Sequence, residues 1–324
     1  MATARSWREP HHLDGPHRVR PEQIDALNLV FSDAFTERYR RDGMVGVRVP
    51  SLNPAIWRYA IEDAADGAML WRDGDGEIAA FNIAHHSRQE GWMGPLAVRP
   101  DLQGSGAGKE IVRAGIEWLK GRGARIIGLE TMPRTMENIG FYSGLGFLPK
   151  RLTITLTLDA SPADRPVSLL GRLGARDREA AVEQCRALVQ SLRAEYDFTR
   201  EIDLTDKLSL GDTVLLRDGG ELRGFALCHT APLVEGRVRE ELRVLKLVLA
   251  RDDDVEPMAR ALRDFARRSA TRRVAVRVQG EFEEMHARLV AMGARVRWTD
   301  LRMTLAGYGE PKPNAGVILS NWEI

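Results

Sequence analysis

The chain has 324 residues, of which 44% are apolar and 29% charged, and its 47 basic side chains nearly balance its 46 acidic ones. This length suits two domains of ordinary size, and the composition is typical of a globular protein. A net charge of +1 disfavours a nucleic-acid binder, and no apolar run is long enough for a membrane-spanning helix or, within residues 1–16, for a secretory signal. We therefore expect a cytoplasmic protein with neither nucleic-acid nor membrane partners. Cys185 and Cys228 lie in unlike local patterns, which predicts neither a disulfide framework nor a metal site.

Taken in chain order, the first half alternates patterns typical of helices and of strands. Apolar residues near helical spacing predict helices over residues 21–35, 54–65, 106–120 and 135–143. Short or alternating apolar runs predict strands over residues 68–72, 77–85, 94–98, 125–129 and 147–158. The polar, proline-bearing segment 159–166 has the composition of a linker. A helix over 176–193 and strands from residue 212 follow it.

The second half repeats patterns of the first. GEIAAFNIAH (residues 76–85) aligns with GELRGFALCH (residues 220–229), and LGFLPKRLTITL near residue 150 resembles MGARVRWTDLRMTL near residue 300. Because the order of the elements also matches, we interpret the chain as two tandem copies of one fold. The predicted parts are a first copy over 1–158, a linker over 159–166, a second copy over 167–308 and a tail over 309–324.

A glycine-rich turn between a predicted strand and a predicted helix is the most informative segment. Residues 96–112 read LAVRPDLQGSGAGKEIV, with Gly104, Gly106 and Gly108 in the turn. Glycines let a ligand approach the backbone closely, and the N–H groups of the turn and the helix N-terminus form an anion site that suits a pyrophosphate. The spacing fits neither the phosphate loop of nucleotide triphosphatases nor the G-x-G-x-x-G turn of dinucleotide-binding folds.

This turn resembles the Q/R-x-x-G-x-G/A signature of the GNAT superfamily of acetyl-CoA-dependent N-acyltransferases, which reads QGSGAG over residues 103–108 here. A second signature, NIGFYSGLGF, follows over residues 138–147. The resemblance covers residues 17–157 and implies an α/β fold of two tandem GNAT-like domains, each a mixed, mostly antiparallel sheet flanked by helices. It implies that acetyl-CoA contacts Leu96, Ala97, Val98, Gln103, Gly104, Ser105, Gly106, Ala107, Gly108, Lys109, Asn138 and Phe141.

The resemblance also implies catalytic roles. Tyr142 matches the usual general acid, and a phenol with a reference pKa of about 10 stays protonated at neutral pH. The backbone N–H of Ala97 or Val98 is expected to face the thioester oxygen. The general base is left open. Glu130, acting through a water, and His85 are the candidates, His86 is a third option, and some members of the superfamily use no dedicated base.

The second copy lacks the features that would bind a coenzyme. Where the first copy has its glycine-rich turn, residues 249–257 read LARDDDVEP, without a glycine and with four acidic side chains. Residues 286–294, HARLVAMGA, contain no tyrosine. Negative charge repels a pyrophosphate, so we expect this copy to bind no acyl-CoA and to serve a structural role.

These patterns predict an N-acetyltransferase that moves acetyl from acetyl-CoA to a primary amine of a small molecule or peptide by direct attack, with no metal. The alternatives are an acyl-CoA-binding sensor or scaffold without turnover and a nucleic-acid-associated modifier. Arg38, Arg40, Arg41 and Arg48 predict a basic rim near the acceptor side that disfavours polycationic acceptors. Either a monomer or a homodimer is compatible with the sequence.

Overall fold

The computed structural model describes residues 13–164, 166–311, 313 and 315–324. Most of the segment for which we expected no secretory signal, residues 1–12, lies outside this described part. The helices are α1 (Ile24–Arg41), α2 (Pro54–Ala64), α3 (Ala107–Gly121), α4 (Met136–Ser143), α5 (Ala175–Leu192), α6 (Thr199–Lys207), α7 (Val255–Arg268) and α8 (Glu283–Ala291). The strands are β1 (Asp14–Arg18), β2 (Ala68–Arg72), β3 (Ile78–Ser87), β4 (Glu90–Val98), β5 (Ile126–Thr131), β6 (Phe147–Asp159), β7 (Ser168–Leu169), β8 (Gly211–Asp218), β9 (Glu221–His229), β10 (Glu241–Leu249), β11 (Arg273–Gln279), β12 (Arg295–Leu305) and β13 (Val317–Ser320).

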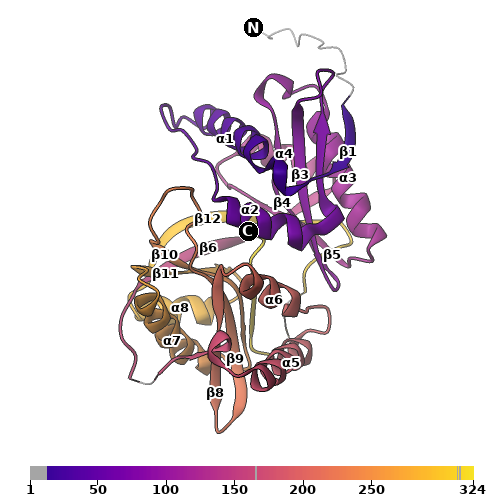
Figure 1. Ribbon diagram of the computed structural model, residues 1–324. Helices are drawn as coiled ribbons and strands as arrows, with labels where there is room; N and C mark the ends of the chain where they lie inside the picture. Colours follow the sequence, from indigo (N-terminus) through magenta and orange to yellow (C-terminus); the bar gives the residue numbers. More distant parts are fainter. Residues whose placement is uncertain (1–12, 165, 312, 314) are drawn as a thin grey trace.

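One sheet of 13 strands runs through both halves of the chain (Figure 1). Its order is β1-β2-β3-β4-β5-β12-β6-β11-β10-β9-β8-β7, with β13 paired to β10. Read from its two edges, the sheet presents the same series twice, β1 to β5 from one edge and β7 to β11 from the other. Neighbouring strands are antiparallel except for β4 with β5 and β10 with β11. The predicted mixed, mostly antiparallel fold flanked by helices and its tandem repeat are thereby confirmed.

The two halves exchange strands where they meet. β12, the last long strand of the second half, pairs with β5 of the first half through Leu301 to Thr304. β6, the last strand of the first half, pairs through Thr153 to Asp159 with β11 of the second half. If the chain divides at the predicted linker, each part therefore completes the sheet of the other. The boundaries themselves stay a prediction.

Local sequence explains the first half of this sheet. In the hairpin between β2 and β3, Asp73 Oδ1 accepts the backbone N–H groups of Asp75 and Glu77, each at 3.0 Å, which holds the turn closed. β3 is buried along most of its length because it lies between two layers of helices. Its Phe81 and Ile83 join the core under α1 and α2. Its Ala80 and Ala84 join the core under α3.

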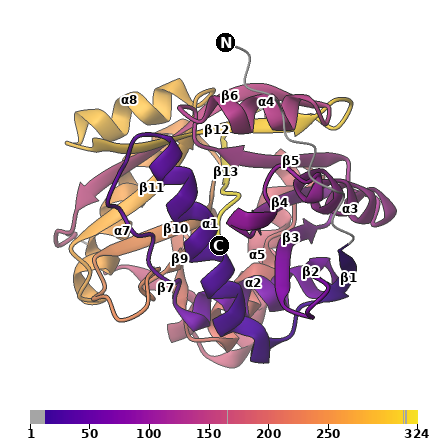
Figure 2. The same ribbon diagram turned by 90° about the horizontal axis from the view of Figure 1, so that it is seen from above.

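The tail beyond β12 returns to the middle of the molecule. Figure 2 shows β13 running between the two halves, next to β10. Val317, Leu319 and Trp322 are all buried, so the tail is part of the core rather than an appendage. No helix in the described part of the chain has the length and apolar content that crossing a membrane requires.

Candidate active site

The glycine-rich turn connects the end of β4 to α3, as the sequence predicts. Gly104 and Gly106 have φ angles of +85° and +102°, which side-chain-bearing residues rarely adopt, and a Cβ at either position would meet only open space. Gln103 Nε2 donates to the carbonyl oxygen of Val98 at 3.1 Å and so ties the turn back to β4. The turn is therefore held in a fixed shape that a large ligand can approach.

Alternate N–H groups of this turn are free to bind a ligand. Among the residues that the structure describes, no acceptor bonds the backbone N–H of Gly104, Gly106 or Gly108. The intervening N–H groups do have partners, since Ser105 N–H donates to the Leu102 carbonyl and Ala107 N–H to Ser105 Oγ, both at 3.4 Å. Three unpaired donors at the N-terminus of α3 form a site for an anion, and exposed Lys109 adds a cation beside it.

β4 and β5 separate next to this turn. Their parallel pairing runs from Glu90 with Ile126 to Met93 with Leu129 and then stops, although β4 continues to Val98. We call the opening beyond Met93 and Leu129 the first wedge. No described strand lies in it between β4 and β5.

The register of β4 decides which N–H groups point into the first wedge. Arg99 N–H donates to the Ala79 carbonyl at 2.9 Å, so Arg99 faces β3. Because N–H directions alternate along a strand, Ala97 also faces β3, whereas Leu96 and Val98 face the wedge. Of the two donors that the sequence offered for the thioester oxygen, this register favours Val98.

The second half contains the corresponding opening, but the chain itself fills it. The parallel pairing of β10 with β11 ends at Arg243 with Ala275. Beyond that point, β13 pairs antiparallel with β10 through Lys246 to Leu249. The other edge of this part of β10 is taken by β9, so β13 lies on the β11 side, within what we call the second wedge. The acidic turn next to it is also occupied, since Asp254 pairs with Arg223 at 2.5 Å and Asp253 with Arg288 at 3.0 Å.

Tyr142 lies in α4 with its ring in the core under α3. Its ring contacts Phe141 and Phe147 edge-on, with centroids 5.1 and 6.1 Å away. Burial raises the pKa of the Tyr142 hydroxyl, which keeps it protonated at any physiological pH. No group in the described part of the chain bonds this hydroxyl, so its proton is free for a ligand.

Phe141 and Asn138 lie on the same helix. A Cβ at Gly108 would lie 3.3 Å from the ring of Phe141, so Phe141 packs under the glycine-rich turn. Asn138 Nδ2 lies 3.5 Å from Thr131 Oγ1, at the end of β5. Thr135, three residues earlier, is buried and donates to Asp42 Oδ2 at 2.9 Å. Asn138 is partly exposed, so of these two side chains it is the more accessible to a ligand.

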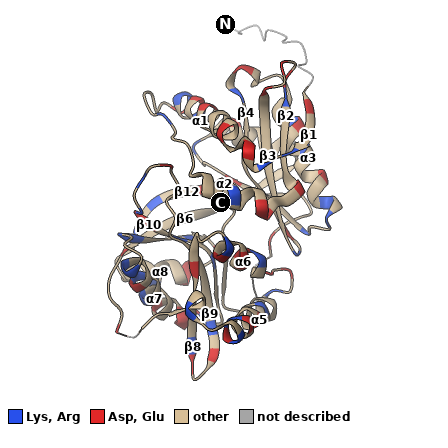
Figure 3. Ribbon diagram, viewed as in Figure 1, with Lys and Arg blue, Asp and Glu red and all other residues tan. Residues whose placement is uncertain are grey.

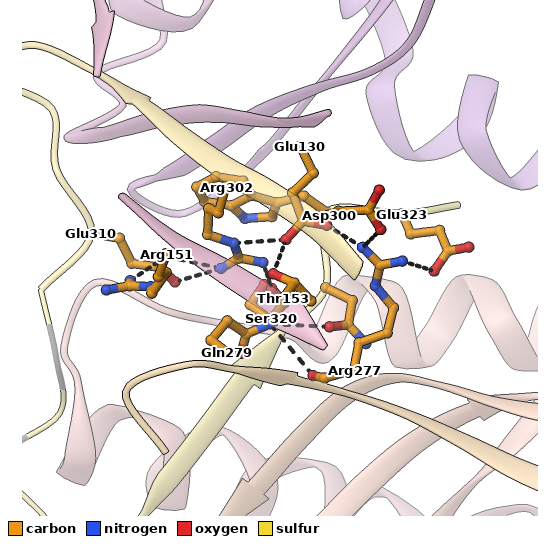
Figure 4. Close-up of polar contacts among 12 residues, drawn as sticks. Glu130, Arg151, Thr153, Arg277, Gln279, Asp300, Arg302, Glu310, Ser320 and Glu323 are labelled. Atoms are coloured by element: carbon orange, nitrogen blue, oxygen red, sulfur yellow. Dashed lines mark hydrogen bonds and ion pairs between the residues drawn. The ribbon is translucent and has the colours of Figure 1, made fainter. Parts of the chain in front are cut away.

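Glu130 is locked in a buried ion network that the second half supplies (Figure 4). Its Oε1 accepts from Arg302 Nε of β12 at 2.9 Å, and its Oε2 pairs with Arg277 of β11. Thr153 Oγ1 donates to it at 2.5 Å. Burial alone would raise the pKa of Glu130, but Arg277 and Arg302 outweigh it and hold the pKa at about 2. A carboxylate so weakly basic and so fully bonded argues against the general-base role that the sequence offered.

His85 is equally engaged. It is buried, its ring stacks on Trp92 with centroids 3.9 Å apart, and both ring nitrogens have partners. Nδ1 lies 2.5 Å from Asp63 Oδ2 and Nε2 lies 3.1 Å from the carbonyl oxygen of Gly94. Neither nitrogen is free to take a proton from an acceptor amine, which argues against a base role here too. Asp63 has no motif that marks it in the sequence, so its partnership with His85 was not predicted.

The predicted basic rim on and after α1 is neutralised by neighbouring acids. Arg38 pairs with Asp42 at 2.5 Å, Arg40 with Glu37 at 2.7 Å, and Arg48 with Asp33 at 2.6 Å. Arg41 also pairs with Glu37. Figure 3 shows acidic residues next to basic ones along α1. The sequence argument that this rim disfavours polycationic acceptors therefore does not hold.

Comparisons with known proteins agree with this geometry. Residues 31–147 match the model of the acetyltransferase (GNAT) family. This segment contains α2, the first wedge, the glycine-rich turn and Tyr142. No curated protein sequence matches the chain.

Solved structures extend the likeness to the whole chain. A proposed acetyltransferase from Pyrococcus horikoshii superposes with a TM-score of 0.67 at 16% identity, covering 100% of this chain and 99% of that one. A tandem GNAT protein from the clavulanic acid biosynthesis pathway gives 0.60 at 14% identity, covering 93% and 100%. A GCN5-related N-acetyltransferase from Sphaerobacter thermophilus gives 0.57 at 15% identity, covering 90% and 94%. At these identities the likeness establishes the fold.

Proposed function

Because residues 31–147 match the acetyltransferase (GNAT) family and the whole chain shares the fold of a tandem GNAT protein, we propose that its first half transfers acetyl from acetyl-CoA to a primary amine of a small molecule or peptide. The diphosphate of the coenzyme would bind the N–H groups of Gly104, Gly106 and Gly108. The open space at Gly104 and Gly106, where a Cβ would touch nothing, leaves room for it. The pantetheine arm would lie along β4 in the first wedge.

The reaction is a direct displacement. The neutral amine nitrogen attacks the thioester carbon, so a C–N bond forms while the C–S bond breaks. The carbonyl oxygen gains negative charge during attack, and the N–H of Val98 is placed to stabilise it, a contribution of about 3 kcal/mol for one such donor. The leaving thiolate takes the proton of the Tyr142 hydroxyl, and the proton of the product nitrogen passes to solvent.

No side chain is needed as a general base in this scheme. Glu130 and His85, the two bases that the sequence offered, are both fully bonded. The acceptor must then arrive as the neutral amine. Orientation of the two reactants contributes about 7 to 11 kcal/mol where geometry is well matched, which is enough to drive a reaction without such a base.

One observation carries the proposal: the first wedge and its turn leave donors unpaired, whereas the second wedge is filled by β13. Unpaired backbone donors beside a strand are costly unless a ligand or water satisfies them. A coenzyme that offers a diphosphate and two amides along one arm matches that row of donors.

The test is a thiol-release assay with acetyl-CoA against amino acids, peptides, aminoglycosides and polyamines. We expect thiol release that depends on one class of amine and on Tyr142. Coenzyme binding by calorimetry without thiol release from any amine would instead support a sensor or scaffold. Absence of both binding and release would contradict the proposal altogether.

A further inference from the structure

A chain of polar contacts links the second half to the first wedge. Arg200, at the start of α6, donates from Nη2 to Asp63 Oδ1 at 2.7 Å. The other oxygen of Asp63 contacts His85 Nδ1, and His85 Nε2 contacts the Gly94 carbonyl. Asp63 and His85 are 4% and 1% exposed, so water does not screen the contact between these two side chains.

The partners of His85 fix the orientation of its ring. Its Nδ1 lies 2.5 Å from Asp63 Oδ2 and its Nε2 lies 3.1 Å from the carbonyl oxygen of Gly94, so the ring cannot turn without losing a contact. Burial alone would raise the pKa of Asp63, but His85 and Arg200 outweigh it and hold the pKa at about 2. Asp63 is therefore an ionised carboxylate that holds both side chains.

The far end of this chain is the point where the first wedge opens. Met93 is the last residue of β4 that pairs with β5, and Gly94 follows it directly. The N–H groups of Leu96 and Val98, which face the wedge, come two and four residues later. A shift of the Gly94 carbonyl therefore moves the donors that the thioester would meet.

We propose that His85 is a positioning residue: oriented by Asp63, which Arg200 of the second half holds in turn, it fixes Gly94 and so sets the direction in which β4 leaves β5. This inference rests on the proposed function for its kinetic consequence. It gives the second half, which has no coenzyme site of its own, a definite part in the chemistry of the first. The corresponding residue of the repeat, His229, contacts no carboxylate among the described residues: its Nε2 contacts Thr205 Oγ1 at 3.0 Å, and its Nδ1 has no hydrogen-bond partner there.

The kinetic test uses Arg200→Ala, because Arg200 is a half-exposed side chain whose loss leaves the core intact. We expect kcat to fall about tenfold, since displacement of a reacting group by a fraction of an ångström carries a cost of that order. The Kd for acetyl-CoA, dominated by the glycine-rich turn, should change less than about threefold. Arg200→Lys should restore most of kcat.

The matched control is Lys207→Ala. Lys207 lies on the same helix and pairs with Glu62 of the same partner helix, α2, at 3.0 Å, but it does not touch Asp63. We expect its kcat to equal that of the wild type. An equal loss in both variants, or no loss in Arg200→Ala, would overturn the positioning role. In His85→Gln, the shorter side chain can reach only one of the two partners of His85. This variant should therefore lower kcat further than Arg200→Ala.

A second readout does not depend on turnover. The backbone amide NMR signals of Gly94, Leu96 and Val98 should shift in Arg200→Ala and stay in place in Lys207→Ala. Unchanged signals in Arg200→Ala with an active wild-type enzyme would overturn this inference and leave the proposed function standing. Shifted signals in a protein that releases no thiol would support the positioning role and count against the proposed function.

Discussion

Each half of the sheet has one parallel strand pair that opens into a wedge, β4 with β5 in the first half and β10 with β11 in the second. In the first half, no strand of the described residues lies in the wedge, and the turn beside it is rich in glycine. In the second half, β13 occupies the wedge, and the turn beside it carries acidic side chains paired with arginines. The same arrangement of strands thus leaves one wedge open and fills the other with part of the chain itself.

The strand β13, which fills the second wedge, explains how the second half stays folded. An opened strand pair exposes backbone donors and acceptors that must be satisfied. β13 satisfies them in the second half, and Trp322 just beyond it donates to Glu90 Oε1 of the first half at 2.8 Å. The segment that fills the second wedge therefore also connects the two halves.

Replacing Gly106 by valine should produce the largest effect on binding. The φ of +102° is strained for a β-branched residue, so the turn must change shape and its N–H groups must move. We expect acetyl-CoA affinity, measured by calorimetry, to fall about 100-fold or more, which is what losing two charge-assisted hydrogen bonds implies. Gly220→Val is the control, because Gly220 has a φ of +92° in equally open space in the second half. Comparable weakening in Gly220→Val would contradict the distinction between the halves.

Tyr142→Phe tests the chemical step. We expect kcat to fall about 100-fold with an unchanged KM for acetyl-CoA, since only the proton donor is lost. Tyr308→Phe removes a hydroxyl beside the same core cluster and should leave kcat unchanged. A Tyr142→Phe enzyme with full kcat would remove this residue from the mechanism.

Trp322→Ala tests the filled wedge. Trp322 is 4% exposed and packs against Gly128 of β5, so its truncation should lower the free energy of unfolding by about 3–5 kcal/mol. Trp298, which is 40% exposed, is the control, and its truncation should cost less than about 1 kcal/mol. Denaturant unfolding measures both. Equal losses would mean that the tail does not hold the halves together.

Glu130→Gln should act mainly on stability. Breaking a buried ion pair costs about 3 kcal/mol, whereas kcat should change little because this carboxylate is not the base. The pKa of Glu130 is about 2 in the folded protein against a reference of 4.5. A lowered pKa stabilises the folded state above the reference value, and this contribution is lost as pH falls from about 4.5 towards 2. The stability difference between wild type and variant should therefore be constant above pH 5 and shrink below it, and a kcat loss as large as that of Tyr142→Phe would revive the base assignment.

Much of the fold could be predicted because short segments of the sequence determine where its helices and strands form. The strand over 68–72 lies where predicted, and α3 begins one residue after its expected start. The glycine-rich turn was visible because positive φ angles and close ligand approach both demand glycine.

Sequence patterns do not show which residues far apart in the chain contact one another. Alternation in β6 and β12 indicates which face of each strand is buried, but not that the two strands exchange sheets. Arg200 and Asp63 are 137 positions apart and each looks like an ordinary surface charge in its own helix. The bonded state of Glu130 and His85 depended on such distant partners, so the two candidate bases were not distinguishable from structural residues.

The most direct test of coenzyme binding in the first wedge is a crystal structure of the full chain soaked with acetyl-CoA. We predict one coenzyme per chain, with its diphosphate on the N–H groups of Gly104, Gly106 and Gly108. Its pantetheine arm should lie beside Val98, and β13 should remain in the second wedge. A coenzyme in the second wedge in place of β13, or a glycine-rich turn left empty at saturating acetyl-CoA, would contradict this prediction.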